Sequence, residues 1–146
     1  MIQVRQIDAD SINYLIQELE QFEKNKAIKS GLKAGGNVFK TGGRQRLKQR
    51  LKSSKGTNNL SNSFRTRVKR NEAGVLTGFM RGKNGGNHSH LVDRGTKKRQ
   101  TKSGANRGVM PANYFWTDTE NIDRPKAVNE IFAGVEKAVK QINNKR

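Results

Sequence analysis

Cysteine is absent from this 146-residue chain, and proline and aromatic residues are scarce. Without cysteine there is no disulfide framework and no thiolate metal site, which fits folding in a reducing cytoplasm. Only 32% of the residues are hydrophobic and 6% are aromatic, so we expect a thin core that a partner or self-association stabilises. No apolar run approaches the ~20 residues of a membrane span, and the first residues lack the layout of a signal peptide. We therefore expect an intracellular protein without a membrane segment.

Acidic residues are nearly missing from the middle of the chain. Residues 25–107 contain 22 lysines and arginines but only two acids, Glu72 and Asp93, whereas residues 1–24 and 108–146 carry net charges of −3 and +1. A block this basic usually meets a polyanion, which would be nucleic acid, an acidic protein surface or membrane headgroups. The alternative is disorder of the free protein, because low hydrophobicity combined with high charge opposes collapse.

Two helical stretches are predicted before residue 52. The first has apolar residues at helical spacing, namely Ile12, Leu15, Ile16, Leu19 and Phe22. The second covers residues 25–51, with an apolar stripe of Ile28, Leu32, Phe39, Leu47 and Leu51. Five glycines interrupt it, at positions 31, 35, 36, 42 and 43, and each costs about 1 kcal/mol against alanine. Either the helix breaks near residues 41–43, or other backbone approaches it closely.

The rest of the chain predicts a small sheet and a closing helix. Phe64–Lys69 alternates in polarity as a half-buried strand does, and Asn71–Gly74 is a turn into an antiparallel partner, Val75–Met80. Residues 81–87 and 97–107 are predicted to be open loops, the second strongly basic. Pro125 opens a final helix whose buried face comprises Ala127, Val128, Ile131, Phe132, Val135, Ala138, Val139 and Ile142.

These elements predict one α+β domain over residues 1–146, with amphipathic helices at both ends and a small antiparallel sheet between them. We divide it into a helical, basic part (1–52), strands and a turn (60–96), a basic loop (97–109), and an aromatic segment with the C-terminal helix (110–146).

The residue types and their spacing give little indication of a catalytic or metal-binding site. His88, His90 and Asp93 are close in sequence, but on a strand Asp93 would face away from the two histidines, so we predict no metal site. A nuclease would need clustered carboxylates for Mg²⁺, and the basic region has two acids. No nucleophile triad, phosphate loop or sequence-reading nucleic-acid motif is present. We expect no enzyme activity and no cofactor.

Two segments nevertheless form a pattern. His90-Leu91-Val92-Asp93-Arg94-Gly95-Thr96 is followed, after the basic loop, by Met110-Pro111-Ala112 and Tyr114-Phe115. Together with Asn59-Leu60-Ser61-Asn62-Ser63 ahead of the first strand, this region resembles the core of the head–tail joining (tail-completion) proteins of tailed bacteriophages, the family described as similar to the tenth gene product of a lambdoid coliphage. The order of elements, with helices first, then a sheet, then a closing helix, is also similar.

The resemblance implies a virion structural protein of the phage neck, assembled in the cytoplasm of a bacterial host. Such a protein would form a closed ring, sixfold or twelvefold, between portal or adaptor proteins and tail proteins, around packaged double-stranded DNA. A ring of six chains would carry six times the charge of +18, whereas a duplex segment a few tens of ångströms long offers only about 20 phosphates. Part of the charge should then face acidic surfaces of adjoining rings.

Three groups of residues are the candidates for these roles. The cations proposed to contact DNA or a partner are Lys40, Arg44, Arg46, Lys48, Arg50, Lys52, Arg94, Lys97, Lys98, Arg99, Lys102 and Arg107. Asp93, Gly95 and Thr96 should form a structural turn, with a positive φ at the glycine and side-chain hydrogen bonds to the turn backbone. Tyr114, Phe115 and Trp116 are the candidate anchors against a neighbouring subunit. The alternative function is a stand-alone, sequence-independent nucleic-acid-binding protein of a mobile element.

Overall fold

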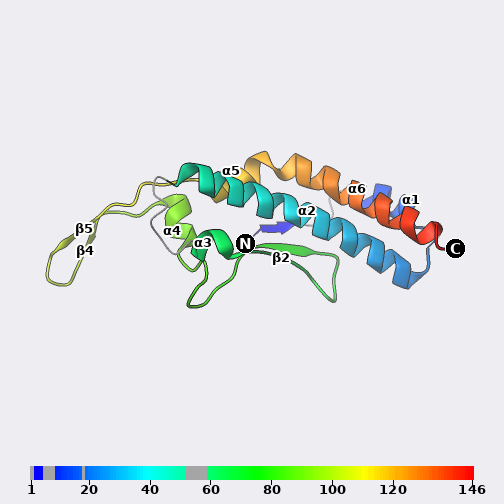
Figure 1. The fold of residues 1–146 in the computed structure, drawn as a ribbon, viewed down its shortest axis with the longest axis horizontal. Helices are drawn as coiled ribbons and strands as arrows, with labels where there is room; N and C mark the ends of the chain where they lie inside the picture. The colour runs from blue at the N-terminus through cyan, green and yellow to red at the C-terminus, as the bar shows by residue number, and fades with distance from the viewer. Residues whose placement is uncertain (1, 5–8, 18, 52–58) are drawn as a thin grey trace.

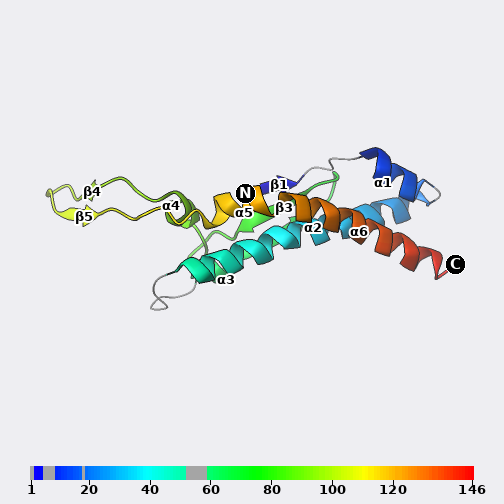
Figure 2. The ribbon, with the colours of Figure 1, turned by 90° about the horizontal axis from the view of Figure 1, so that it is seen from above.

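A single long helix organises the molecule. The computed structural model describes residues 2–4, 9–17, 19–51 and 59–146, and it is α+β, as predicted. Helix α2 (Gln21–Arg50) is flanked by the antiparallel helix α6 (Arg124–Asn143) on one side and by a three-stranded sheet on another (Figure 1). Helix α1 (Ala9–Ile16) packs against α6 near the end of the molecule that carries the C-terminus (Figure 2).

The sheet contains the predicted hairpin and one further strand. Strand β2 (Phe64–Val68) pairs antiparallel with β3 (Val75–Phe79), so that Phe64 lies opposite Phe79, and this hairpin confirms the sequence prediction. Strand β1 (Ile2–Val4) pairs with the other edge of β3, giving the order β1-β3-β2. Three residues are too few to show a period in the sequence, which is why β1 was not predicted.

The glycines of α2 lie where other elements approach its backbone. The helix is continuous through residues 41–43, so of the two alternatives the close approach is correct. A Cβ at Gly35 would lie 2.4 Å from Ile131 Cγ1 on α6, and a Cβ at Gly36 would lie 2.6 Å from Thr66 Cγ2 on the sheet. Packing on both sides therefore offsets the low helix propensity of the five glycines.

The first predicted helix is divided between two helices. Helix α1 ends at Ile16, and α2 begins at Gln21 with a reciprocal capping box between Glu20 and Glu23. Because the apolar pattern spans this break, it overestimates burial: Leu15 and Phe22 are 36% and 74% exposed, whereas Ile12, Ile16 and Leu19 are buried. Leu51, the last member of the second predicted stripe, is also exposed.

Three short helices and one hairpin lie between α2 and α6 in addition to strands β2 and β3. They are α3 (Asn59–Asn62), α4 (Ser89–Arg94), β4 (Arg99–Gln100), β5 (Asn106–Gly108) and α5 (Phe115–Ile122). The prediction of an open loop over residues 97–107 is wrong, because β4 and β5 pair antiparallel. Their turn is closed by a hydrogen bond from the Thr101 N–H to the Ala105 carbonyl, with Gly104 at a φ of 82°. Pro125 lies in the first turn of α6, as predicted.

Candidate functional site: a basic arm and its base

The β4–β5 hairpin projects beyond one end of the body, opposite the end that carries the C-terminus (Figures 1 and 2). We call residues 97–109 the arm. Every residue from Lys97 to Arg107 is exposed except Thr101, which is half-buried. The arm carries five cations and no acid, namely Lys97, Lys98, Arg99, Lys102 and Arg107. None of them, nor exposed Arg94 beside the arm, forms an ion pair with a described residue.

Two hydrogen bonds join the strands where the arm leaves the body. The Thr96 N–H donates to the Met110 carbonyl at 2.9 Å, and the Met110 N–H donates to Thr96 Oγ1 at 3.0 Å. The two segments of the family pattern, which the arm separates in sequence, thus meet at the base of the arm. Thr96 therefore links the two sides of the arm, where a bond within its own turn was predicted.

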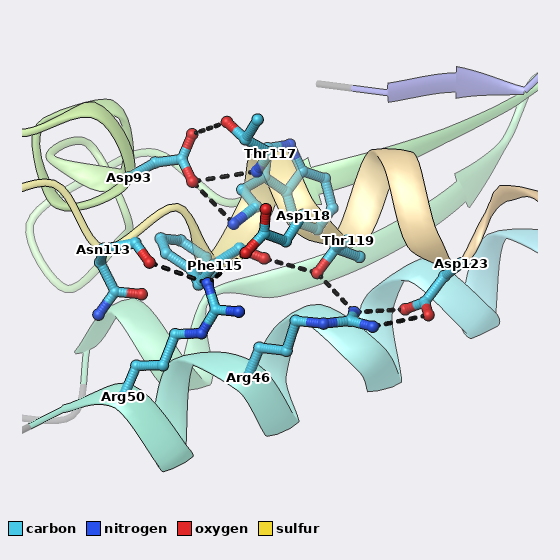
Figure 3. Close-up of polar contacts among 10 residues, drawn as sticks. Arg46, Arg50, Asp93, Asn113, Phe115, Thr117, Asp118, Thr119 and Asp123 are labelled. Atoms are coloured by element: carbon cyan, nitrogen blue, oxygen red, sulfur yellow. Dashed lines mark hydrogen bonds and ion pairs between the residues drawn. The ribbon is translucent and has the colours of Figure 1, made fainter.

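Asp93 joins the base of the arm to helix α5. Its side chain is 5% exposed and accepts hydrogen bonds from the Trp116 N–H at 2.8 Å, the Thr117 N–H at 3.0 Å and the Thr117 hydroxyl at 2.6 Å (Figure 3). The carboxylate thus satisfies backbone N–H groups in the first turn of α5. The prediction that Asp93 binds its own turn is wrong, because α4 holds its side chain against the start of α5.

Gly95 ends α4 and precedes the arm, with a φ of 75°, the positive value expected from the sequence. The site also lacks space for a side chain, since a Cβ would lie 2.7 Å from the Met110 carbonyl oxygen and 2.8 Å from the Ala112 nitrogen. Positive φ and backbone contact both require glycine here.

Three of the predicted DNA-contacting arginines have partners within the same chain. Arg46 forms a two-pronged ion pair with Asp123, at 2.6 and 2.9 Å, and donates to Thr119 Oγ1 (Figure 3). Arg50 pairs with Asp118 at 2.6 Å. Although residues 25–107 contain only two acids, acids more than 60 residues away in sequence lie beside the last turns of α2 and pair with these arginines.

Arg44 is also engaged within the protein. Its Nε donates to the Ser61 carbonyl at 3.0 Å, and its guanidinium lies 5.7 Å from the centre of the Phe64 ring. Lys40 and Lys48 have no ion pair among the described residues, and Lys52 lies outside them. Of the described cations in the predicted stripe from 40 to 52, Lys40 and Lys48 are the two without an ion pair or hydrogen bond to another described side chain or carbonyl, and their contact with DNA or a partner stays a prediction.

The Arg46–Asp123 pair should contribute measurably to stability. Both side chains are mostly buried, at 18% and 14% exposure, and the hydrogen bond with Asp123 raises the pKa of the Arg46 guanidinium above its ordinary value. We expect Arg46→Ala to lower the free energy of unfolding by about 2–3 kcal/mol, because it leaves Asp123 without its cation. Urea denaturation measures this loss. Lys48→Ala removes the same charge two residues away on the same helix and should cost less than about 0.5 kcal/mol; equal losses would contradict the assignment.

The aromatic anchors fall into two groups. Phe115 and Trp116 are 0% and 8% exposed, and both lie edge-to-face against Phe64 and Phe79, with ring centres 5.0–6.2 Å apart. They are core residues, so their prediction as anchors is wrong. Tyr114 is 52% exposed, at a φ of 56°, and it alone of the three is free to meet a neighbouring subunit.

The described residues contain no group of three or more histidine, aspartate or glutamate side chains placed to hold a metal ion. His88 and His90 are both exposed, and Asp93 is turned to α5. Within the same part of the chain, no helix has the length and apolar character needed to cross a bilayer.

The chain was compared with protein-family models, curated proteins and solved structures, and none matches it.

Proposed function

We propose that the protein is a structural subunit of a phage neck, which joins a ring between portal and tail and uses its basic arm to contact an acidic surface of a neighbouring component. The observation that carries this proposal is the arm, whose cations are exposed and unpaired beyond the body. The support from sequence is the resemblance described above, whose two segments meet at the base of the arm.

The arm has the properties of an assembly contact. Isolated two-stranded hairpins are marginally stable in water, and no residue beyond the base is buried in the body of the protein. The base, in contrast, is fixed by Thr96, Gly95 and the buried Asp93. A fixed base that carries an exposed, uniformly basic hairpin is suited to reach a partner, and binding would supply the counter-charge that the arm lacks.

Disruption of the gene in a phage that encodes the chain tests the function directly. We expect electron microscopy of the lysate to show DNA-filled heads beside detached tails, or heads without tails. The wild-type gene supplied in trans should restore joined particles. Intact tailed particles in the disrupted lysate would contradict a role at the joint.

The arm can be tested in the same complementation assay. Replacing its five cations with glutamine should leave the fold intact but reduce the number of joined particles by tenfold or more, because the contact with the acidic partner is lost. The matched control replaces five exposed cations outside the arm, namely Lys83, Arg124, Lys137, Lys140 and Lys145, and should complement as wild type does. Equal complementation by both variants would show that the arm is not the contact.

A further inference from the structure

Four of the α2 cations that form no ion pair with a described residue lie on one face of the helix, whereas Lys24, which also forms none, lies on the other side. Lys26, Lys33, Lys40 and Lys48 are separated by 7, 7 and 8 residues. At 100° per residue they lie within about 80° of one another around the helix axis. The same geometry places Gly31 and Gly35, which contact α6, on the opposite side of the helix. We call these four lysines the lysine ridge.

No acid of α2 compensates the ridge. The helix contains nine lysines and arginines, and its single acid, Glu23, pairs with Arg146. The ridge lysines have no ion pair among the described residues. Lys40 and Lys48 each lie four residues from Arg44, and such like-charge neighbours destabilise a helix. A face kept only for solubility would alternate the two signs, so the uniform sign of the ridge indicates an anion that binds there.

A groove lined by both polar and apolar residues runs beside the ridge, between α2 and α6. Its volume is about 670 Å³. Neutral hydrogen-bonding side chains of α2 line it, namely Asn37, Thr41, Gln45 and Gln49. On its α6 side are Lys126 and Glu130, with Asp123 already neutralised by Arg46. The surface next to the ridge therefore supplies uncharged polar groups of the kind that contact phosphate and sugar oxygens.

We propose that the lysine ridge is a phosphate-binding surface that lies along duplex DNA and contacts the backbone phosphates that face α2. From Lys26 to Lys48 the helix rises about 33 Å, close to one turn of B-form DNA. The inference rests on the proposed function, since it names the surface that would face DNA in the neck. It replaces the 40–52 stripe, because Arg46 and Arg50 of that stripe are bound to acids of the same chain.

The salt dependence of DNA binding tests this surface. The full-length protein is titrated into a fluorescein-labelled 30-base-pair duplex, and anisotropy is measured between 50 and 300 mM KCl. Each phosphate contact contributes about 0.9 to the slope of log K against log salt. We expect K26Q/K33Q/K40Q/K48Q to lower the magnitude of the slope by about three to four, with at least a tenfold loss of affinity at 100 mM salt.

The matched control removes four cations from the arm instead, as K97Q/K98Q/K102Q/R107Q. Both variants have the same net charge, so a long-range effect of charge would weaken binding equally in the two, and that result would overturn the proposal. A larger loss in the arm variant, or no DNA binding by the wild type, would also overturn it. A selective loss in the ridge variant supports it.

The thermal stability of the ridge variant distinguishes a loss of DNA binding from a loss of folding. Because like-charge neighbours are removed, its melting temperature at low salt should rise by about 2–5 °C. A fall below the wild-type value would contradict an uncompensated ridge. The outcome is separable from the function of the protein: if the ridge fails to bind DNA but the gene disruption still yields unjoined heads, the neck assignment stands and only the DNA-facing surface is wrong.

Discussion

Replacement of Asp93 by alanine should cost about 3–5 kcal/mol of the free energy of unfolding. The buried carboxylate accepts three hydrogen bonds, two of them from backbone N–H groups in the first turn of α5. Removing it leaves those donors without a partner, and each buried unsatisfied donor costs about 1–3 kcal/mol. This loss is a large part of the roughly 5–15 kcal/mol that stabilises a typical domain. Urea or thermal unfolding of the purified protein measures it.

Asp93→Asn keeps the size of the side chain and changes only its hydrogen bonds, so it separates the contribution of the hydrogen bonds from that of packing. The amide keeps one acceptor for the N–H groups but turns a donor toward the Thr117 hydroxyl, so we expect an intermediate loss of about 1–2 kcal/mol. Because Asp93 also fixes the base of the arm, the alanine variant should increase amide hydrogen exchange at residues 96 and 110, whose mutual hydrogen bonds close the base. Stability within 1 kcal/mol of the wild type in the alanine variant would show that α5 does not depend on Asp93.

Gly31→Ala should be strongly destabilising, although it places a better helix former in a helix. A Cβ there would lie 2.5 Å from Val135 Cγ2 and 2.6 Å from the Ile131 carbonyl oxygen. The carbonyl belongs to the backbone of α6, so relief requires the two helices to separate. Against the gain of about 1 kcal/mol in helix propensity, overpacking should produce a net loss of about 2–4 kcal/mol, measured as a lower midpoint of urea denaturation.

The neighbouring position supplies the control. Ser30 is exposed on the same helix, so Ser30→Ala should leave stability unchanged or raise it by a few tenths of a kcal/mol. A second change, Val135→Ala, removes one of the two clashes and should rescue Gly31→Ala only in part, because the Ile131 carbonyl remains. If Gly31→Ala is as stable as Ser30→Ala, α2 and α6 do not pack as closely as described.

Local patterns in the sequence predicted the elements whose formation depends on neighbouring residues. The β2–β3 hairpin follows from alternation on both sides of a turn, and α6 follows from a helical repeat of apolar residues after Pro125. The positive φ at Gly95 was predicted in the same way, from a glycine between polar, turn-forming residues. The same method failed at α1, because one helical repeat continues across the chain reversal between Ile16 and Gln21.

The roles of charged and aromatic residues needed the tertiary structure. Arg46 and Lys48 look alike in sequence, but 77 residues separate Arg46 from Asp123, and no local pattern relates the two. The sequence also does not show whether Trp116 lies in the core or on the surface. Its packing against Phe64 places it in the core. Asp118 and Asp123 are visible in the sequence, but they could not be assigned to Arg50 and Arg46 without the packing of α5 against α2.

The sequence by itself determined that the protein is an α+β chain with a basic middle, no cysteine chemistry and a glycine-rich second helix. It could do so because composition, periodicity and turn chemistry are properties of residues close together in the chain. Only the tertiary structure decided that α2 is unbroken, that residues 97–109 form an arm, and which cations are neutralised within the protein. Those outcomes depend on contacts between segments distant in sequence, where packing overrides local preference and a charge gains or loses a partner.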